Sequence, residues 1–418
     1  MKSSGTAKKE SREKVGKKKT TEQKGSGKKP ADGKKKTASD DELKKKRSQS
    51  KDCQRLSLSE QNANRAKWAK RKCKDISTEF NEKIKRYVVT TLTADVCQKN
   101  DAKNRYADVL CLDATRVVLR DWPDDFIHAS WVKIPDGTAY ICTQGPLTET
   151  IEDFWQMCYQ ERASIILMLC DFFEGSETEK CCQYFPQDKG QQNKYDMFTI
   201  TNKAVLDDLS EVEGIKVCTM EIAKRHSKPV TTKHVFMKSW PDQLAPVDAA
   251  PFLALWKWVK LNYEGLPVVV HCSAGVGRTS TFVGFELANY RIAYDPSISL
   301  MDIVKELRSM RYQSIQSHVQ FLYLHICLLE YYMAENIIDR EGKEYEFIEE
   351  YKKHAQRKLD KAMKAMNVAR TQRSNPDKRK IDSKGSKPNT PAKTRARTAR
   401  KSKSRPADAE SSPRQNTS

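Results

Sequence analysis

The chain has 418 residues, with 76 lysines and arginines against 55 aspartates and glutamates, a formal net charge of +21. The excess lies at the ends, because residues 1–50 hold 18 basic and 7 acidic residues and residues 370–418 hold 15 and 4. Residues 51–369 hold 43 and 44, the balance of an ordinary globular domain. No apolar run approaches the roughly 20 residues of a spanning helix, which argues against a membrane-spanning segment.

The two ends are poor in apolar residues and rich in Lys, Ser, Thr, Gly, Pro and Ala. Such segments cannot bury enough surface to offset the entropy of ordering, so we expect disordered basic tails at residues 1–52 and 370–418. Two interpretations stay open: solvated tails, or a nuclear address or electrostatic contact with nucleic acid or another polyanion. The C-terminal run lacks aromatic residues, which favours phosphate contact without base stacking.

Twelve cysteines are spread along the chain without a CxxC pair or a Cys/His cluster at zinc spacing, so no structural metal is expected. The N-terminal sequence "MKSSGTAKKESREK" has no apolar core of a secretory signal. We therefore expect a cytoplasmic or nuclear protein with reduced thiols.

The middle of the chain alternates short β-rich runs with helical patterns. Strands are expected at 139–144, 164–169, 197–206, 214–222, 231–240 and 267–272, and helices at 150–161, 249–265, 281–295, 300–311 and 319–335. This alternation indicates an α/β fold, a sheet covered on both faces by helices.

Helical patterns also precede and follow the middle. Residues 53–75 predict a lead-in helix, and residues 77–87 continue the helical pattern. Residues 336–369 predict a charged helical extension that docks on the domain or projects from it, with a short coiled-coil contact as the alternative.

The stretch "VVVHCSAGVGRTS", residues 268–280, carries the strongest chemical signal. It predicts a buried strand, a short loop and the start of a helix, an arrangement whose free amides and dipole favour a bound anion. Gly275 and Gly277 let the backbone turn so that successive amides face one point. Arg278 adds a planar fork that matches two phosphate oxygens.

Cys272 begins this loop. The field that binds a phosphate also stabilises a thiolate, which can attack phosphorus in line, and Thr279 could donate its hydroxyl to the sulfur when it leaves. The alternative is a packed, inert thiol, since free cysteine is among the most buried residues. A Walker A loop is excluded, because it would need Gly at 272 and Lys at 278.

A thiolate attack on a phosphate ester also needs a proton for the departing oxygen. The stretch "KSWPDQLAP", residues 238–246, offers Asp242 in a proline-flanked loop after a strand. The alternative is an ordinary turn aspartate.

The pattern HC-x5-R with "AGVGRT", preceded by "WPD", resembles the protein tyrosine phosphatases. The chain is identified as a member of the phosphotyrosine-specific, non-receptor type, along roughly residues 75–335. Further motifs in the same order are "KNRYADVLCLDATRVVL" (103–119), "DDFIHAS" (124–130), "YICTQGPL" (140–147), "DFWQM" (153–157), "EKCCQYFP" (179–186) and "IQSHVQF" (315–321). The resemblance implies a single catalytic domain at 76–335, with a twisted mixed sheet flanked by helices on both faces.

The resemblance also implies roles in the hydrolysis of phosphotyrosine in proteins. Cys272 would be the nucleophile of a phosphocysteine intermediate, and Asp242 the general acid and then the general base. Arg278 would clamp the phosphate. The loop residues that would supply amides to it are Ser273, Ala274, Gly275, Val276, Gly277 and Arg278 itself.

Four further residues would handle the substrate and the water. Tyr106 would form the wall on which the substrate ring packs, and Asp108 would hold the substrate backbone. Gln316, with Gln320 near it, would position the attacking water. No metal or cofactor is implied, because the loop amides and the arginine carry the charge.

Three positions depart from the family's usual pattern: Leu244 and Ser280 stand where glycine is usual, and His128 stands where asparagine is usual. The family's acidic loop before "KC" also aligns poorly, so its glutamate is not assigned. None removes a catalytic group, so an active enzyme is expected. The alternative is a phosphotyrosine-binding pseudophosphatase with little turnover. A dual-specificity or lipid phosphatase is disfavoured by Tyr106, which implies a deep pocket, and a factor acting mainly through its basic tails is the remaining alternative.

Overall fold

The computed structural model describes residues 56–70, 78, 80–90, 92–174, 178–238, 240 and 244–374. Residues 1–52, expected as a disordered tail, lie outside these ranges, as does nearly all of the tail expected at 370–418. Asp242, the expected catalytic acid, also lies outside the described residues.

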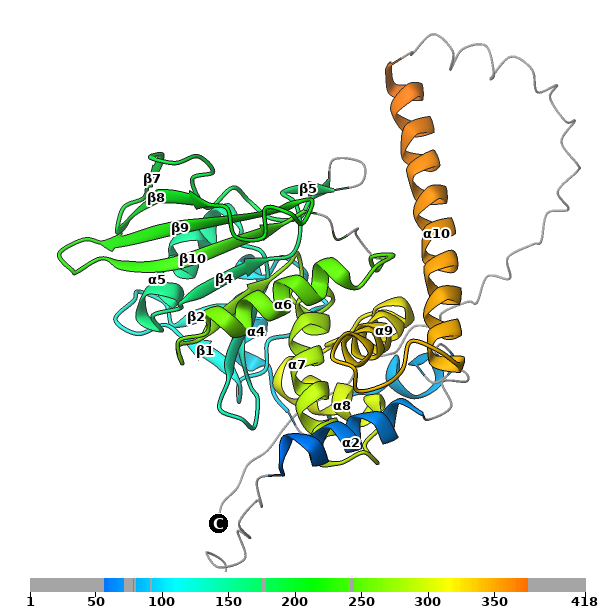
Figure 1. Cartoon of the computed structure of the whole chain (residues 1–418). Helices are drawn as coiled ribbons and strands as arrows, with labels where there is room; N and C mark the ends of the chain where they lie inside the picture. The colour runs from blue at the N-terminus through cyan, green and yellow to red at the C-terminus, as the bar shows by residue number, and fades with distance from the viewer. Residues whose placement is uncertain are drawn as a thin grey trace, which may run out of the picture. The chain divides into compact units, whose positions relative to one another are not determined.

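A mixed sheet forms the centre of the described domain, as the resemblance implied (Figure 1). Its order is β1-β2-β3-β11-β4-β10-β9-β8-β7, and β3, β11, β4 and β10 run parallel while the other pairs are antiparallel. The strands are β1 (Arg116–Val118), β2 (Phe126–Lys133), β3 (Ala139–Thr143), β4 (Ile165–Met168), β7 (Gln192–Lys194), β8 (Phe198–Leu206), β9 (Ile215–Lys224), β10 (Val230–Met237) and β11 (Val268–His271). A separate hairpin pairs β5 (Phe173–Glu174) with β6 (Thr178–Glu179).

The strand β11 lies between β3 and β4 in the parallel part of the sheet. All four of its side chains are fully buried, which explains the uninterrupted apolar run that precedes the loop. The loop after β11 therefore leaves the carboxyl edge of parallel strands, where open α/β sheets bind their ligands.

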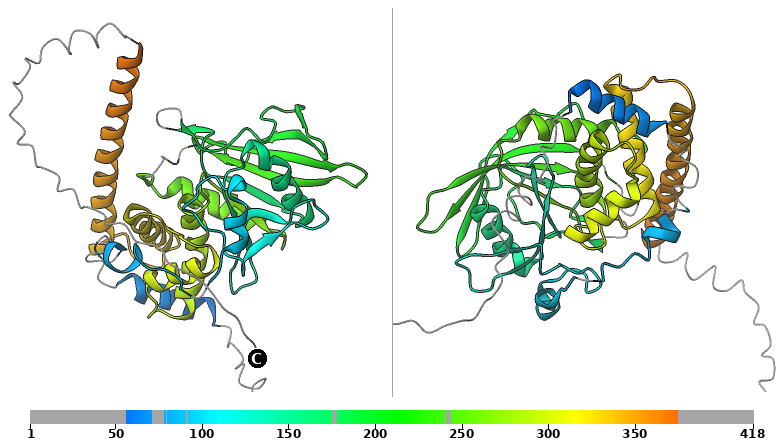
Figure 2. Two further views of the ribbon diagram at one scale, coloured as in Figure 1. Left: turned by 180° about the vertical axis from the view of Figure 1, so that it is seen from behind. Right: turned by 90° about the horizontal axis from the view of Figure 1, so that it is seen from below.

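Helices cover both faces of this sheet (Figure 2). Val268 pairs in register with Tyr140, whose ring packs on Phe282 of α7. His271, which points to the opposite face because side chains alternate along a strand, packs on Phe154 of α5. Thus α5 (Ile151–Gln160) and α7 (Arg278–Tyr294) lie on opposite faces.

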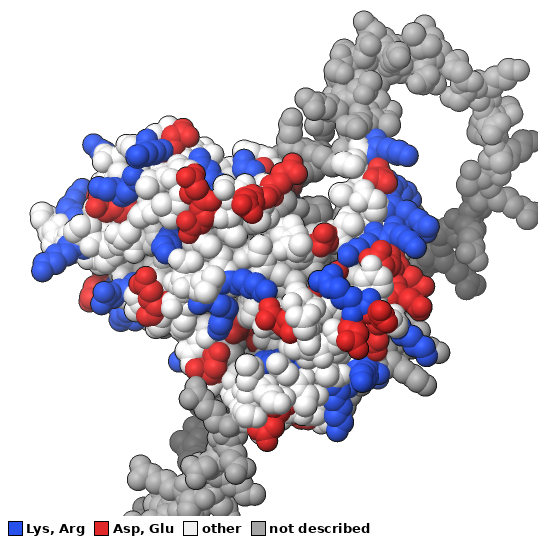
Figure 3. Space-filling model, viewed as in Figure 1, with Lys and Arg blue, Asp and Glu red and all other residues white. Residues whose placement is uncertain are grey.

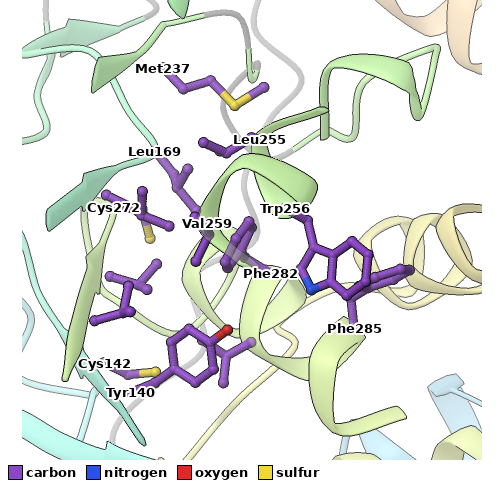
Figure 4. Close-up of a cluster of buried hydrophobic side chains, with 14 of the residues drawn as sticks. Tyr140, Cys142, Leu169, Met237, Leu255, Trp256, Val259, Cys272, Phe282 and Phe285 are labelled. Atoms are coloured by element: carbon purple, nitrogen blue, oxygen red, sulfur yellow. The ribbon is translucent and has the colours of Figure 1, made fainter. Parts of the chain in front are cut away.

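A helical layer accompanies α7 on its face. It contains α6 (Ala250–Asn262), α8 (Leu300–Met310) and α9 (His318–Ala334), and Phe252 of α6 packs on both Phe282 and Phe285 of α7. Figure 4 shows part of this core, where Cys142 and Cys272 lie among apolar side chains. The remaining short elements are α4 (Asp95–Lys99) and the turns η1 (Phe80–Ile84), η2 (Asp101–Lys103) and η3 (Thr148–Thr150).

The lead-in segment contains α2 (Leu58–Ala69), which begins with a capping box between Ser57 and Glu60. The helix packs on α7, where Asn64 Nδ2 donates to Ala293 O at 2.8 Å. Trp68 is buried and donates to Ile298 O at 3.1 Å. The helix therefore belongs to the same core as the sheet.

The helical pattern predicted over 77–87 is matched in part: among its described residues, Thr78 is α-helical and η1 is a π-helical turn. Phe80 and Ile84 are both fully buried, and Lys85 N donates to Phe80 O at 2.8 Å. Side chains four residues apart lie on one face of a helical turn, so both apolar side chains point into the core.

The charged extension forms α10 (Lys343–Ser374). Ile348 and Tyr351 are buried against the domain, and Tyr351 donates its hydroxyl to Pro246 O at 2.7 Å. Lys352 forms a 2.9 Å ion pair with Glu330 of α9. The helix is therefore docked through its first turns, while six of the ten side chains at 356–365 are exposed.

Three buried histidines and the half-buried His325 predict the acid sensitivity of the fold. Burial lowers the pKa of His128 to about 3 and of His271 and His325 to about 4, and lowers that of His234 well below its usual value. Because an unfolded histidine titrates near 6.5, the unfolded chain binds more protons between about pH 6.5 and 4. Each such histidine should lower the free energy of unfolding by about 1.4 kcal/mol per pH unit across that window.

Urea unfolding of the full chain at pH 7, 5.5 and 4.5 measures this dependence. The exposed His226 supplies the control, since His226→Asn should leave the pH slope unchanged. A free energy of unfolding that stays constant between pH 6.5 and 4.5 would contradict the prediction.

Candidate functional site

The loop at residues 272–278 connects the buried end of β11 to the first turn of α7. Gly275 has φ +71°, and a Cβ there would lie 2.1 Å from Thr143 O at the end of β3. Only glycine fits both the left-handed backbone and this close approach. The loop thus takes its tight course because the neighbouring parallel strand lies directly against it.

The carbonyl side of the loop is held by Arg311, whose side chain is completely buried. Its Nε donates to Gly275 O at 3.1 Å and its Nη2 donates to Ala274 O at 3.0 Å. Amide and carbonyl point in opposite directions within a rigid peptide plane. Arg311 therefore turns the amides of Gly275 and Val276 away from itself.

Cys272 is 3% exposed and lines a cavity of about 180 Å³. Residues from four separate segments share that lining: Tyr106, Asp108, Val109, Lys180, Cys272, Ser273, Ala274, Gly277, Arg278, Gln316 and Gln320. The thiol is thus buried by the fold yet open to a cavity, which distinguishes it from a packed core cysteine.

Tyr106 forms one wall of the cavity and contacts the loop directly. Its hydroxyl lies 2.8 Å from Ser273 Oγ. Tyr106 O also accepts from Val109 N at 3.2 Å, which closes a turn. The aromatic wall therefore stands beside the loop, with Asp108 in the same turn.

Arg278 is buried and forms a bidentate ion pair with Glu174 of β5, at 2.6 Å from Nη1 and 2.9 Å from Nη2. Its Nη1 also donates to Trp240 O at 3.2 Å. Burial alone would lower the pKa of Arg278, but the hydrogen bonds and charge of Glu174 outweigh it and raise the pKa. The guanidinium is thus a permanent cation, and the ion pair with Glu174 fixes the orientation of its plane.

Gln316 and Gln320 approach the loop at Gly277. A Cβ on Gly277 would lie 2.9 Å from Gln316 Oε1 and 2.7 Å from Gln320 Nε2, so glycine makes room for both side chains. Gln320 Oε1 also accepts from Gln316 N at 3.0 Å. Two polar groups that can bind water therefore stand at the rim of the cavity.

The segment before Gln316 is strained. Gln313 and Ile315 both have φ +59°, a conformation that is unfavourable for a β-branched residue. Ile315 N donates to Val276 O at 2.8 Å, and Arg308 Nη2 donates to Ile315 O at 3.2 Å. These bonds hold the segment against the loop.

The imidazole of His271 lies beneath the loop on the α5 face. Its Nδ1 is 3.2 Å from Cys272 O, and its Nε2 is 2.7 Å from the hydroxyl of Tyr184. Burial lowers the pKa of His271 to about 4, so the ring is neutral at pH 7. A carbonyl can only accept, so Nδ1 carries the hydrogen and Nε2 accepts from Tyr184.

Most of the residues predicted from the sequence therefore meet at one cavity. Gly275 and Val276 do not line it, and Thr279 is buried behind the loop with a hydroxyl that finds no hydrogen-bond partner among the described residues. Asp242 lies outside the described residues, although its neighbour Trp240 contacts Arg278.

The three unusual residues each make a specific contact. Ser280 Oγ lies 2.9 Å from Ser314 Oγ in the buried region behind the loop. Leu244 O accepts from Trp240 Nε1 at 3.3 Å. His128 is buried on β2, next to Arg311.

Sequence reasoning missed Glu174, Lys180, Val109 and Arg311. The acidic stretch around Glu174 aligns poorly with the family pattern, and its β5–β6 hairpin is too short for a periodic signal. Arg311 follows α8, where the sequence reads it as the last residue of an ordinary amphipathic helix. Only the folded chain shows that Glu174 pairs with Arg278 and that Arg311 binds the carbonyls of the loop.

The other thiols near the loop are chemically quiet. Burial raises the pKa of Cys142 to about 12 and raises that of Cys170 well above its usual value. Across the described residues, no three His, Cys, Asp or Glu side chains gather so that they could hold a metal ion. No described helix has the length and apolar character needed to cross a membrane.

Comparison with known proteins agrees with this geometry. A sequence model of the protein-tyrosine phosphatase family matches residues 100–330. Rat tyrosine-protein phosphatase non-receptor type 20 is 34% identical over 236 residues, covering 56% of this chain and 55% of that protein. Human tyrosine-protein phosphatase non-receptor type 9 is 32% identical over 290 residues, covering 63% and 47%. The chain thus spans about half the length of each relative.

A solved structure shows a similar fold. It is described as the "structural basis of PTPN18 fingerprint on distinct HER2 tyrosine phosphorylation sites". The TM-score is 0.53 at 28% sequence identity, and the match covers 58% of this chain and 88% of that one.

The ion pair between Glu174 and Arg278 gives a prediction for anion binding. Glu174→Gln leaves an amide that cannot accept from both guanidinium nitrogens of Arg278. The orientation of the guanidinium plane is then no longer fixed. We expect a loss of about 3 kcal/mol in unfolding free energy, because one partner of a buried pair remains. Inhibition or binding by orthovanadate, an oxyanion of phosphate's shape, should weaken about tenfold, as measured by titration.

The same hairpin offers a matched control in Glu179, a half-exposed residue whose carboxylate lies 3.3 Å from Arg105. Glu179→Gln should change stability by less than about 1 kcal/mol, as for other surface pairs. Equal orthovanadate affinity in the Glu174→Gln and wild-type proteins would contradict the role given to the pair.

Proposed function

The chain belongs to the protein-tyrosine phosphatase family, and from this premise we propose that it hydrolyses phosphotyrosine in proteins through a phosphocysteine intermediate on Cys272. The observation that carries the proposal is one cavity at which Cys272, Arg278 and Tyr106 meet. The thiol at the floor and the tyrosine on the wall fit a phosphate ester with an aromatic ring.

In the first step, the thiolate of Cys272 attacks phosphorus in line, a sulfur–phosphorus bond forms, and the bond from phosphorus to the tyrosyl oxygen breaks. Asp242 gives its proton to that oxygen, so tyrosine leaves as the neutral phenol. The loop amides and Arg278 stabilise the charge on the three equatorial oxygens.

In the second step, water attacks the phosphorus of phosphocysteine, Asp242 takes its proton, and the sulfur–phosphorus bond breaks. Gln316 and Gln320 orient this water from the rim of the cavity. The buried hydroxyl of Thr279, which finds no described partner, is suited to donate to the departing thiolate. Inorganic phosphate leaves and the enzyme returns to its starting state.

The wall at Tyr106 supports selectivity for phosphotyrosine. An aryl phosphate extends far enough from the peptide to bring phosphorus to the sulfur of Cys272, a residue that is only 3% exposed. A phosphoserine or phosphothreonine side chain is shorter and offers no ring to pack on the wall. Because the relatives carry the name "non-receptor", we propose a cytoplasmic or nuclear setting for this chain.

Two substitutions separate the proposed roles. Cys272→Ser should abolish turnover of a phosphotyrosine peptide while the peptide still binds, because the cradle stays and the nucleophile is lost. Asp242→Ala should lower kcat by about 10²–10⁴ with similar peptide affinity, the usual contribution of a general acid. Steady-state kinetics and peptide binding by fluorescence anisotropy measure both effects.

The exposed Asp339 supplies the matched control, and Asp339→Ala should leave kcat and KM unchanged. A near-normal kcat for Asp242→Ala would require another acid. A wild-type chain that binds the peptide without hydrolysing it would instead be a phosphotyrosine-binding pseudophosphatase.

A second role is favoured by the exposed face of α10, where basic side chains gather (Figure 3). Lys353, Arg357, Lys361 and Lys364 are exposed and spaced by four, four and three residues, so they share one helix face. At 1.5 Å per residue, neighbouring members lie about 4.5–6 Å apart along the axis. The helix leads into residues 370–418, with 15 basic and 4 acidic residues, and we propose that both contact nucleic-acid phosphates.

Neutralising the four α10 residues together as Gln tests this role. Each lost phosphate contact removes roughly 0.7–0.9 from the slope of log K against log salt, so the slope should fall by about 3. Fluorescence anisotropy with a mixed-sequence oligonucleotide between 50 and 200 mM salt gives the slope, with the exposed pair Lys189→Gln and Lys194→Gln as control. An unchanged slope in the α10 variant would refute the role of this face.

A further inference from the structure

His128 is a buried imidazole on β2 that lies between two parts of the site, and it is 1% exposed. Its Nε2 is 2.9 Å from Val109 O, and its Nδ1 is 3.1 Å from Arg311 Nη2. Val109 belongs to the cavity wall, and Arg311 holds the loop at residues 272–278. The ring therefore connects the wall to the loop.

The two partners fix the state of the ring. A carbonyl oxygen can only accept and a guanidinium can only donate, so Nε2 carries the hydrogen and Nδ1 holds the lone pair. Burial, together with the charge of Arg311, lowers the pKa of His128 to about 3, which keeps the ring neutral at pH 7. Nε2 therefore donates to Val109 O, and Nδ1 accepts from Arg311 Nη2.

At one end, the ring supports a buried cation. Besides His128 Nδ1, Arg311 donates to Gly275 O, Ala274 O and, at 3.3 Å, Ser130 Oγ. These acceptors are all neutral, and Arg311 forms no ion pair with a described carboxylate. A buried charge without a counterion depends on each acceptor, because every lost bond leaves an N–H unpaired in the interior.

At the other end, the ring holds the wall. Val109 is 4% exposed, and its amide closes the turn with Tyr106. The hydrogen bond from His128 fixes the carbonyl of the same residue. The wall is thus held at Tyr106 by the loop and at Val109 by the ring, 2.8 and 2.9 Å from their respective partners.

We propose that His128 is a positioning residue that sets the spacing between the aromatic wall and the phosphate-binding loop, and thereby the depth at which a phosphotyrosine ring reaches Cys272. This inference rests on the proposed function. It assigns a role to a histidine where the family usually has asparagine, whose amide atoms branch directly from Cγ. An asparagine ends one bond short of the position of Nε2, so it cannot bridge both partners in the same way.

That difference yields a pair of variants that each keep one end. His128→Asn places an acceptor where Nδ1 lies but cannot reach Val109. Its KM for a phosphotyrosine peptide should rise about five- to tenfold, with orthovanadate inhibition within about twofold of wild type. His128→Gln places a donor near Val109 but leaves Arg311 without this acceptor. It should weaken orthovanadate inhibition by about five- to tenfold and lower kcat.

Val132→Ala is the matched control, because Val132 is 1% exposed on the same strand and lines no part of the cavity. It should lower stability through a small cavity while leaving KM and orthovanadate inhibition unchanged. A change in KM for Val132→Ala as large as that for His128→Asn would contradict the proposal. Wild-type KM and orthovanadate inhibition in both His128 variants would contradict it as well.

A measurement on the wild-type full chain does not depend on variants or on turnover. The ¹⁵N chemical shifts of the His128 ring should report hydrogen on Nε2 and no titration between pH 5 and 8. Hydrogen on Nδ1 would overturn the proposal even if the chain hydrolyses phosphotyrosine. If the His128 ring carries its hydrogen on Nε2 but the chain does not hydrolyse the peptide, the proposed function is contradicted. The hydrogen-bonded link from the wall to the loop would still be supported.

Discussion

The hydrogen bonds from Arg311 to two carbonyls of the loop at residues 272–278 are the constraint on which the candidate site depends. In the proposed role the loop presents several amides to one point, which is unfavourable for a backbone with no anion bound. Arg311 fixes Ala274 O and Gly275 O from behind, and the carbonyl of Thr143 leaves no space for a Cβ at Gly275. The course of the loop is thus set before any substrate arrives.

The same constraint explains why one thiol differs from its neighbours. All ten described cysteines are buried, so burial alone does not identify a nucleophile. Cys142 and Cys170 are surrounded by packed protein, which disfavours their thiolates and raises the pKa of each. Cys272 lies where the chain leaves the sheet for the loop, and it opens on the cavity that holds Arg278. Its place at the start of the loop is what sets Cys272 apart from the other buried cysteines.

Local patterns allowed much of this arrangement to be predicted from the sequence. The valine run before Cys272 predicts the buried strand, and the spacing from Cys272 to Arg278 predicts the loop. The helical patterns between the strands predict a sheet with helices on both faces. Glu174 and Arg311 could not be predicted in this way, because each acts on the loop across more than 30 residues of sequence. The role proposed for His128 could not be predicted from the sequence either, because it depends on Val109 and Arg311 both contacting the same ring.

The central claim is that Cys272 carries the phosphoryl group during turnover, and rapid chemical quenching tests it directly. The wild-type full chain is mixed with excess phosphotyrosine peptide, quenched in acid within milliseconds, digested and analysed by mass spectrometry. The account predicts one phosphoryl group on the fragment that contains Cys272, formed as tyrosine peptide is released. Hydrolysis of the peptide with no phosphoryl group on Cys272 at any time would contradict it.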